Sequence, residues 1–86
     1  MLEIRTGNLG SDLNIYQNGH RIARTDVFRR NRAFYLVDDS GQNHSNCITA
    51  KDATPRNLAR EPRRVLGLLG MCGLELPADT EVVFVG

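Results

Sequence analysis

The dipeptide Asn18-Gly19 constrains this chain more than any other feature of its sequence. It lies between two runs, Leu13–Gln17 and His20–Val27, that place apolar side chains in a polar background. Asn and Gly both tolerate the positive φ angles that a two-residue type I′ turn requires, and this turn matches the natural twist of paired strands. The sequence therefore predicts a tight β-hairpin at this point.

The turn also determines which residues of the two strands face one another. The predicted pairs are Gln17 with His20, Tyr16 with Arg21, and Ile15 with Ile22. In this register Leu13, Ile15 and Ile22 point to the core, whereas Tyr16 and Arg21 point to the opposite face. We expect Tyr16 and Arg21 to form a partly exposed cation–π pair across the strands.

Strand patterns also lie on both sides of this hairpin. Residues 2–6 alternate between apolar and polar types, which is typical of a half-buried strand. Residues 33–37 carry branched and aromatic side chains on both faces, and residues 42–49 return as a weaker strand after a turn. Residues 1–50 are therefore predicted to form an antiparallel meander.

Residues 54–73 are predicted to be helical, with one break. Thr54 supplies an N-cap oxygen, and Pro55 fits the first helical position because its missing N–H is not needed there. Pro62 lies too deep for one continuous helix, since it removes a backbone hydrogen bond and clashes with the preceding turn. We expect the break near residues 60–61.

The second helical segment, residues 65–72, is apolar on almost all sides, and Gly73 is suited to end it. We expect this segment to be buried on most sides, with Gly67 and Gly70 in close contact with the sheet or with a partner. One face of a small sheet cannot bury a helix that is apolar on most sides, so the sequence favours a homodimer in which a second copy covers the rest. Residues 80–85 read as a final buried strand, inside the sheet or beside the first strand.

Together these segments predict a single α+β domain over residues 1–86. A mostly antiparallel β-sheet of five to six strands, built as a β-hairpin meander (1–50), is covered on one face by one broken helix (54–73) and followed by a final buried strand (80–85). With 86 residues, 41% hydrophobic and 24% charged, the chain has the composition of a folded domain but not the length for two. Barrel and dinucleotide-binding enzymes need longer chains.

The sequence shows no export signal and no membrane span. Residues 1–10 lack a basic stretch followed by an apolar run, and no segment approaches the ~20 apolar residues that cross a bilayer. A cytoplasmic protein is predicted, in which Cys47 and Cys72 stay reduced.

Charged residues are unevenly distributed, although the formal net charge is only +1. Residues 1–64 hold all eleven basic residues and seven acids, whereas residues 65–86 hold three acids and no base. All the basic residues except Lys51 are arginine, whose planar fork matches carboxylates and phosphates. Arginines on a solvated surface are the simpler explanation, and recognition of an anionic partner is the functional one.

Two arginine clusters form the candidate binding surface. Arg29, Arg30 and Arg32 are expected on a protruding connection between strands. The second cluster stands near helical spacing in the broken helix, and its members are Arg56, Arg60, Arg63 and Arg64. Tyr16 and Arg21, on the outward face of the hairpin, complete the candidate site.

We expect a small non-enzymatic protein-binding module that uses these residues against an acidic protein surface, because Arg and Tyr dominate binding hot spots. One form of this hypothesis is a phage- or mobile-element-type inhibitor of a host protein complex, an anti-CRISPR-like anti-defence protein. The alternative is a nucleic-acid-binding module that uses both arginine clusters, with Tyr16 and Tyr35 as stacking platforms.

A metal or thiol site is the third hypothesis and has the least support. His44 and Cys47 have His-x₂-Cys spacing, but His20 and Cys72 would have to complete the four ligands from distant segments. Residues three apart on a strand face opposite sides, which argues against a nucleophilic pair of Cys47 and His44. The sequence therefore predicts no cofactor and no enzymatic activity.

Overall fold

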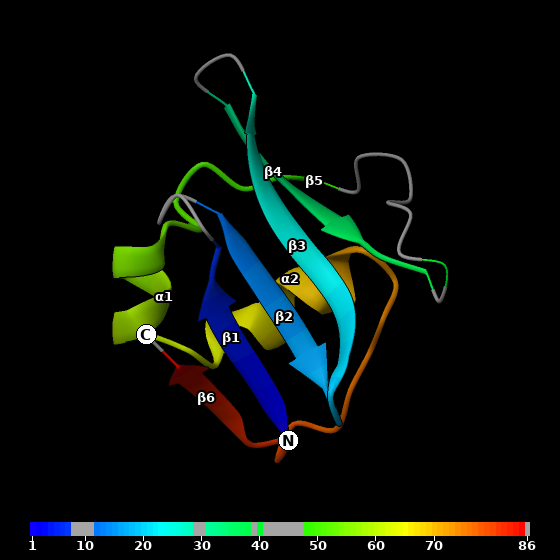
Figure 1. Ribbon diagram of the computed structural model, residues 1–86. Coiled ribbons are helices and arrows are strands. Elements are labelled where there is room, and N and C mark those ends of the chain that lie inside the picture. The colour runs from blue at the N-terminus through cyan, green and yellow to red at the C-terminus, as the bar shows by residue number, and fades with distance from the viewer. Residues whose placement is uncertain (8–11, 29–30, 39, 41–47, 86) are drawn as a thin grey trace.

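The computed structural model describes residues 1–7, 12–28, 31–38, 40 and 48–85. Within them, six strands form one sheet and two helices follow near the C-terminus (Figure 1). The strands are β1 (Leu2–Thr6), β2 (Leu13–Gln17), β3 (His20–Phe28), β4 (Asn31–Leu36), β5 (Ile48–Thr49) and β6 (Val82–Val85). The helices are α1 (Pro55–Arg60) and α2 (Arg64–Met71). This is the predicted α+β architecture.

The sheet has the strand order β5-β4-β3-β2-β1-β6. Neighbours from β1 to β5 pair antiparallel, which confirms the predicted meander. β6 pairs parallel with β1, so the last strand lies beside the first, as predicted. It occupies the edge of the sheet, however, and is therefore half-buried instead of buried: Val82, Val83 and Phe84 are partly covered, and Val85 is 46% exposed.

The β2–β3 hairpin turns at Asn18 and Gly19, whose φ angles of 51° and 84° suit the predicted turn. The predicted pairs Gln17–His20 and Tyr16–Arg21 are present. Beyond them the register shifts, and Ile15 pairs with Ala23, so the predicted pairing of Ile15 with Ile22 is wrong. The cause is a β-bulge at Ile22, which adds one residue to β3 relative to β2.

The connection between β3 and β4 is shorter than predicted. Phe28 pairs with Asn31, and Val27 pairs with Arg32, so both strands extend into the segment that was expected to protrude. Residues 29–30 alone separate the two strands. Arg32 is thus a strand residue, because nothing in this segment prevents the backbone from continuing the ladder.

The predicted broken helix consists of two separate helices. Thr54 caps α1, and its hydroxyl oxygen accepts a hydrogen bond from the Asn57 N–H at 3.1 Å. Pro62 lies in the turn after α1, which confirms the predicted break near residues 60–61, and α2 begins at Arg64. α2 ends at Met71, and Gly73, two residues later, has a φ of 92° in the left-handed region. Neither helix in the described part of the chain is long and apolar enough to cross a membrane.

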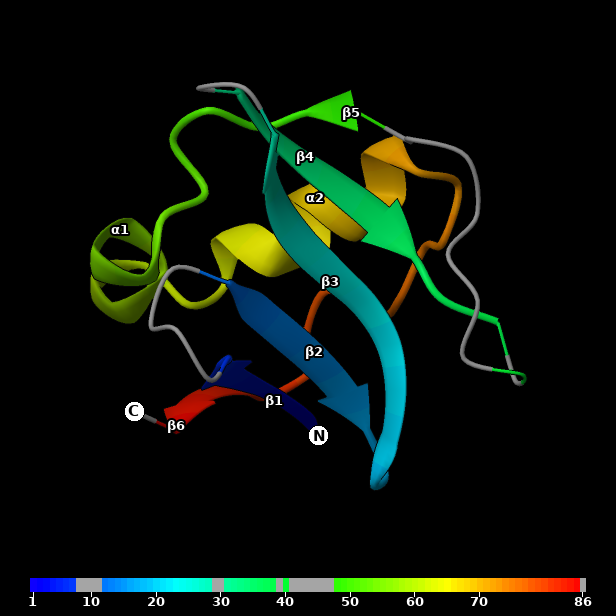
Figure 2. The ribbon, with the colours of Figure 1, turned by 45° about the horizontal axis from the view of Figure 1, so that its top comes forward.

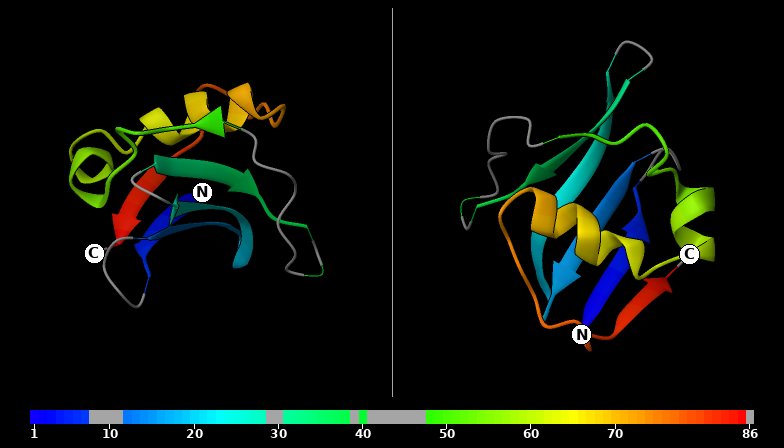
Figure 3. Two further views of the ribbon diagram at one scale, coloured as in Figure 1. Left: turned by 90° about the horizontal axis from the view of Figure 1, so that it is seen from above. Right: turned by 180° about the vertical axis from the view of Figure 1, so that it is seen from behind.

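The core lies between α2 and one face of the sheet (Figure 3). Its largest fully buried apolar side chains are Phe34, Leu2, Ile4, Leu13, Ile15, Leu58, Leu69 and Val65. Those in β1 and β2 alternate with more polar neighbours, as expected for a sheet with one covered face. The hydrophobic pattern of β1 and β2 therefore predicted the core face correctly.

α2 is covered on one side and exposed on the other, instead of buried on most sides. Val65, Leu68 and Leu69 are buried, whereas Gly67 is exposed and Met71 is 69% exposed. A Cβ atom added at Gly67 or Gly70 would meet nothing within 4 Å. The predicted close contact of these glycines with the sheet is therefore wrong.

Candidate functional site

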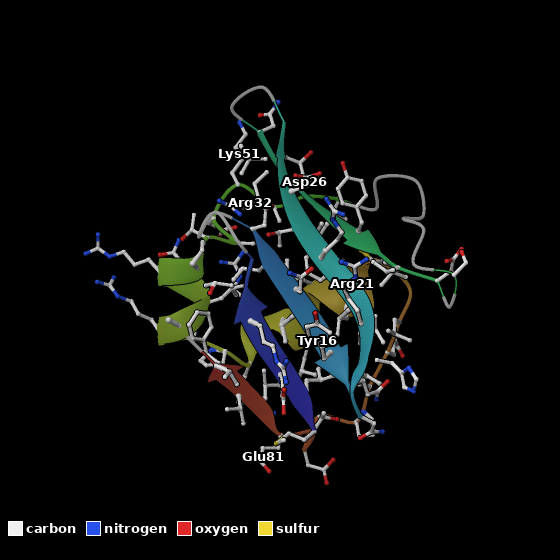
Figure 4. All side chains as sticks on the ribbon, viewed as in Figure 1. Tyr16, Arg21, Asp26, Arg32, Lys51 and Glu81 are labelled. Carbon is white, nitrogen blue, oxygen red and sulfur yellow. The ribbon has the colours of Figure 1, made fainter. Side chains whose placement is uncertain are left out.

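The face of the sheet opposite α2 carries no described helix, and we call it the outer face (Figures 1 and 2). On β1 and β2, the residues next to the buried ones point to this face. They include Glu3, Arg5, Asn14 and Tyr16. Figure 4 shows Tyr16 and Arg21 on this face, in front of β2 and β3.

A hollow of about 430 Å³ opens on the outer face, and we call it the arginine hollow. Its lining residues are Arg5, Thr6, Gly7, Asp12, Asn14, Tyr16, Arg21 and Arg24. Three guanidinium groups and one tyrosine ring from three neighbouring strands thus surround one open space.

The β-bulge at Ile22 is what brings Arg21 and Arg24 to the same face. In a regular strand, residues three apart point to opposite faces. Because the bulge adds one residue, Arg21 pairs with Tyr16 and Arg24 pairs with Asn14, both of which are outer-face residues. The irregularity that shifts the hairpin register therefore also assembles the arginine hollow.

Arg5 lies over the ring of Tyr16, and both residues line the hollow. Its Cζ atom lies 4.9 Å from the ring centroid, within the range of a cation–π contact. Its Nε atom donates a hydrogen bond to a carboxylate oxygen of Glu3 at 3.1 Å, and the two side chains form an ion pair. The predicted cation–π partner was Arg21; in the structure the guanidinium over Tyr16 is that of Arg5.

Arg21 and Arg24 are positioned by single polar contacts. Arg24 forms an ion pair with Asp26, with 2.9 Å between Nη2 and Oδ2. Arg21 Nη1 lies 3.4 Å from Oδ1 of Asn14, and Arg21 has no carboxylate partner in the described part of the chain. Since a guanidinium carries several N–H donors, these contacts leave donors available for an external oxyanion.

The charges in and around the hollow balance. Its three arginines stand against the carboxylates of Glu3, Asp12 and Asp26. The hollow is therefore rich in directed hydrogen-bond donors without being a strongly positive field.

The second predicted arginine cluster is divided between elements. Arg56 and Arg60 lie on α1, are exposed, and have no side-chain partner among the described residues. Arg63 donates to the backbone oxygens of Thr80, at 3.1 Å, and of Ala78. Arg64, in α2, forms an ion pair with Asp52. The predicted helical stripe is interrupted because the chain turns between the two helices.

The contact between Arg64 and Asp52 shifts the pKa values of both groups. The hydrogen bond from Arg64 lowers the pKa of the Asp52 carboxyl, and the same bond raises the pKa of Arg64. Both shifts favour the charged forms of the two groups. Arg64 therefore stabilises an ion pair within the chain.

The first predicted cluster contributes one residue to the described structure. Arg29 and Arg30 lie outside the described residues. Arg32 is half-buried, and its Nη1 atom donates to the hydroxyl oxygen of Thr25 at 3.2 Å. Arg32 therefore also has an intramolecular contact.

Two of the four proposed metal ligands, His20 and Cys72, belong to the described residues. His20 is exposed beside the hairpin turn, and Cys72 is partly buried at the end of α2. His44 and Cys47 lie outside the described residues. Across the ranges that are described, no three His, Cys, Asp or Glu side chains are grouped to hold a metal ion. The metal and thiol hypothesis stays a prediction.

Sequence reasoning identified Tyr16 and Arg21 but missed Arg5, Asn14 and Arg24. Arg5 and Asn14 carry a usable signal, because they occupy polar positions of alternating strands. Arg24 carries none, since its direction depends on a bulge that no Gly or Pro marks in the sequence.

Comparison of the chain with protein-family models, with curated proteins and with solved structures finds no significant match. The function is therefore argued from the outer face itself.

Proposed function

We propose that this chain is a small non-enzymatic protein-binding module whose outer face contacts an acidic surface of its partner. The observation that carries the proposal is the arginine hollow, which three arginines and Tyr16 line on a sheet face without a described helix, with Arg5 over the tyrosine ring. Carboxylates of the partner are the expected ligands, because the guanidinium fork binds them with two parallel hydrogen bonds.

Two arginines of the hollow, Arg5 and Arg24, have intramolecular contacts before binding. Arg5 is fixed between Glu3 and Tyr16, and Arg24 is fixed by Asp26. A side chain that is already ordered loses less conformational entropy on binding, which favours affinity. Arg and Tyr are also the residue types that most often dominate protein–protein binding energy.

The charge distribution supports a protein partner over a nucleic acid. Nucleic-acid affinity depends on several cations that neutralise phosphates. In the hollow Arg5 and Arg24 are each paired with a carboxylate, and Arg32, Arg63 and Arg64 have intramolecular contacts. Mixed charges with one aromatic centre fit a protein surface better.

The test is affinity capture from a lysate of the cells that make the protein, with two matched charge reversals. Arg21→Glu alters the hollow at the arginine without a carboxylate partner, and Arg56→Glu makes the same change on α1. After nuclease treatment, retained proteins are quantified by mass spectrometry. For at least one captured protein, we expect the amount retained by Arg21→Glu to be about tenfold or more below that retained by the wild type. The amount retained by Arg56→Glu should equal that of the wild type.

Two results contradict the proposal. If the wild type and both variants retain equal amounts of every captured protein, the hollow binds none of them. If both variants lose the same captured protein equally, the contact does not lie on the outer face. Retained material that disappears with nuclease and with rising salt would instead support the nucleic-acid alternative. The inhibitor form of the hypothesis stays a prediction until the captured protein is identified.

A further inference from the structure

β6 is an edge strand of four residues that contains no charged residue and no proline. Edge strands in soluble proteins commonly carry Lys, Pro or a bulge that prevents another strand from joining. β6 consists of Val and Phe residues. The exposed side chain of Val85 lies at its end. This edge therefore resembles an interface more than a protected border.

The ladder with β1 determines which backbone groups face outward. The Leu2 N–H donates to the Glu81 C=O at 2.8 Å. Because bonding alternates along a parallel strand, the N–H and C=O groups of Val82 and Phe84 face away from β1. These two residues present the donors and acceptors that an added strand would use.

The two ends of β6 differ in net charge. The exposed acids Asp79 and Glu81 come just before the strand. At this start, the two acids stand against Arg63, which donates to the backbone oxygens of Ala78 and Thr80.

The end of α1 lies beside the C-terminal end of β6, and it carries the exposed Arg60 (Figures 1 and 3). Figure 4 places Glu81 at the opposite end of the strand from α1. Arg56 adds a second exposed cation to α1. At this end, the two exposed arginines of α1 stand against Glu61, the residue that follows the helix.

This arrangement is complementary to itself under a two-fold rotation. If a second β6 joins antiparallel, its acidic start meets the basic end of the first, and the same contact forms a second time. A partner of unrelated sequence would need both features by coincidence, whereas a second copy supplies them automatically.

We propose that a second copy of this chain pairs its β6 antiparallel with this edge, so that Glu81 of each copy contacts Arg60 of the other. The two sheets become one continuous sheet, and the two outer faces lie on the same side of it. The sequence suggested a homodimer through an apolar helix; the edge of the sheet carries the contact instead. This contact does not use the arginine hollow, so the two proposals succeed or fail separately.

The first test is sedimentation equilibrium between about 1 μM and about 1 mM protein. Arg60→Glu and Glu81→Lys each replace an attraction by a repulsion twice per dimer, and we expect each to weaken association about three- to tenfold. The double variant Arg60→Glu/Glu81→Lys restores the attraction with its sign reversed and should recover most of the affinity. Lys51→Glu is the charge-matched control and should associate like the wild type.

A second measurement locates the contact without relying on charge. Amide hydrogen exchange should slow at Val82 and Phe84 as protein concentration rises, whereas the Leu2 amide, already bonded within the sheet, should not change. A monomer at all concentrations overturns the proposal. So does a dimer in which the Phe84 amide is unprotected or the double variant stays as weak as the single ones.

Discussion

The stability of a variant at Gly67 indicates whether the exposed side of α2 is covered in solution. It lies inside α2 on the exposed side, and a Cβ atom there would meet nothing within 4 Å. Glycine inside a helix loses more backbone freedom on folding than alanine does. Neither close packing nor a positive φ angle requires glycine at this position.

Gly67→Ala should therefore raise the free energy of unfolding by about 0.5–1 kcal/mol. Chemical denaturation with urea measures the change, and Gly19→Ala is the contrasting control. Gly19 has a φ of 84° in the hairpin turn, so alanine at that position should destabilise the protein. A loss of stability in Gly67→Ala would mean that the exposed side of α2 is covered in solution.

At the scale of elements, local rules predicted the turns and helix ends. Thr54, Pro62 and Gly73 act on their immediate neighbours through capping, a missing N–H and a left-handed φ, so their effects are independent of the rest of the fold. These signals predicted α1, the break after it and the end of α2.

Interactions between distant segments could not be predicted in this way. The bulge at Ile22 is a feature of the pairing between β2 and β3, and the contact of Arg5 with Tyr16 depends on which strands are neighbours. Arg63 reaches backbone oxygens near Thr80 because of the position of the loop before β6. The hollow depends on such contacts, which is why the sequence identified only part of it.

The ion pair between Asp52 and Arg64 joins the segment before α1 to the start of α2. Arg64 lowers the pKa of Asp52 in the folded protein below its ordinary value of about 4. A lowered folded-state pKa adds stability above the unfolded-state pKa, and this stability is lost as pH falls through the folded-state pKa.

Asp52→Asn should therefore be less stable than the wild type at neutral pH, and its stability should fall less steeply as pH drops below about 4. The urea midpoint measured from pH 7 to low pH gives both quantities. Arg64→Gln removes the same ion pair and should show the same shallower profile. Profiles that match the wild type in both variants would show that the pair does not form in solution.

At the scale of the whole molecule, the two faces of the sheet have different roles. One face packs against α2 and supplies the core, while the outer face orders arginines and a tyrosine that the fold does not need for packing. The central claim is that this ordered outer face binds a protein.

Site-specific photocrosslinking tests that claim most directly. A benzophenone amino acid replaces Tyr16 in the hollow or, as the control, the exposed Met71 on the opposite side of the molecule. After irradiation in a lysate of the producing cells, the account predicts a nuclease-resistant protein adduct from position 16, different in mass from two copies of the chain, and none from position 71. An adduct from position 71 alone, or a nucleic-acid adduct at position 16, would contradict it.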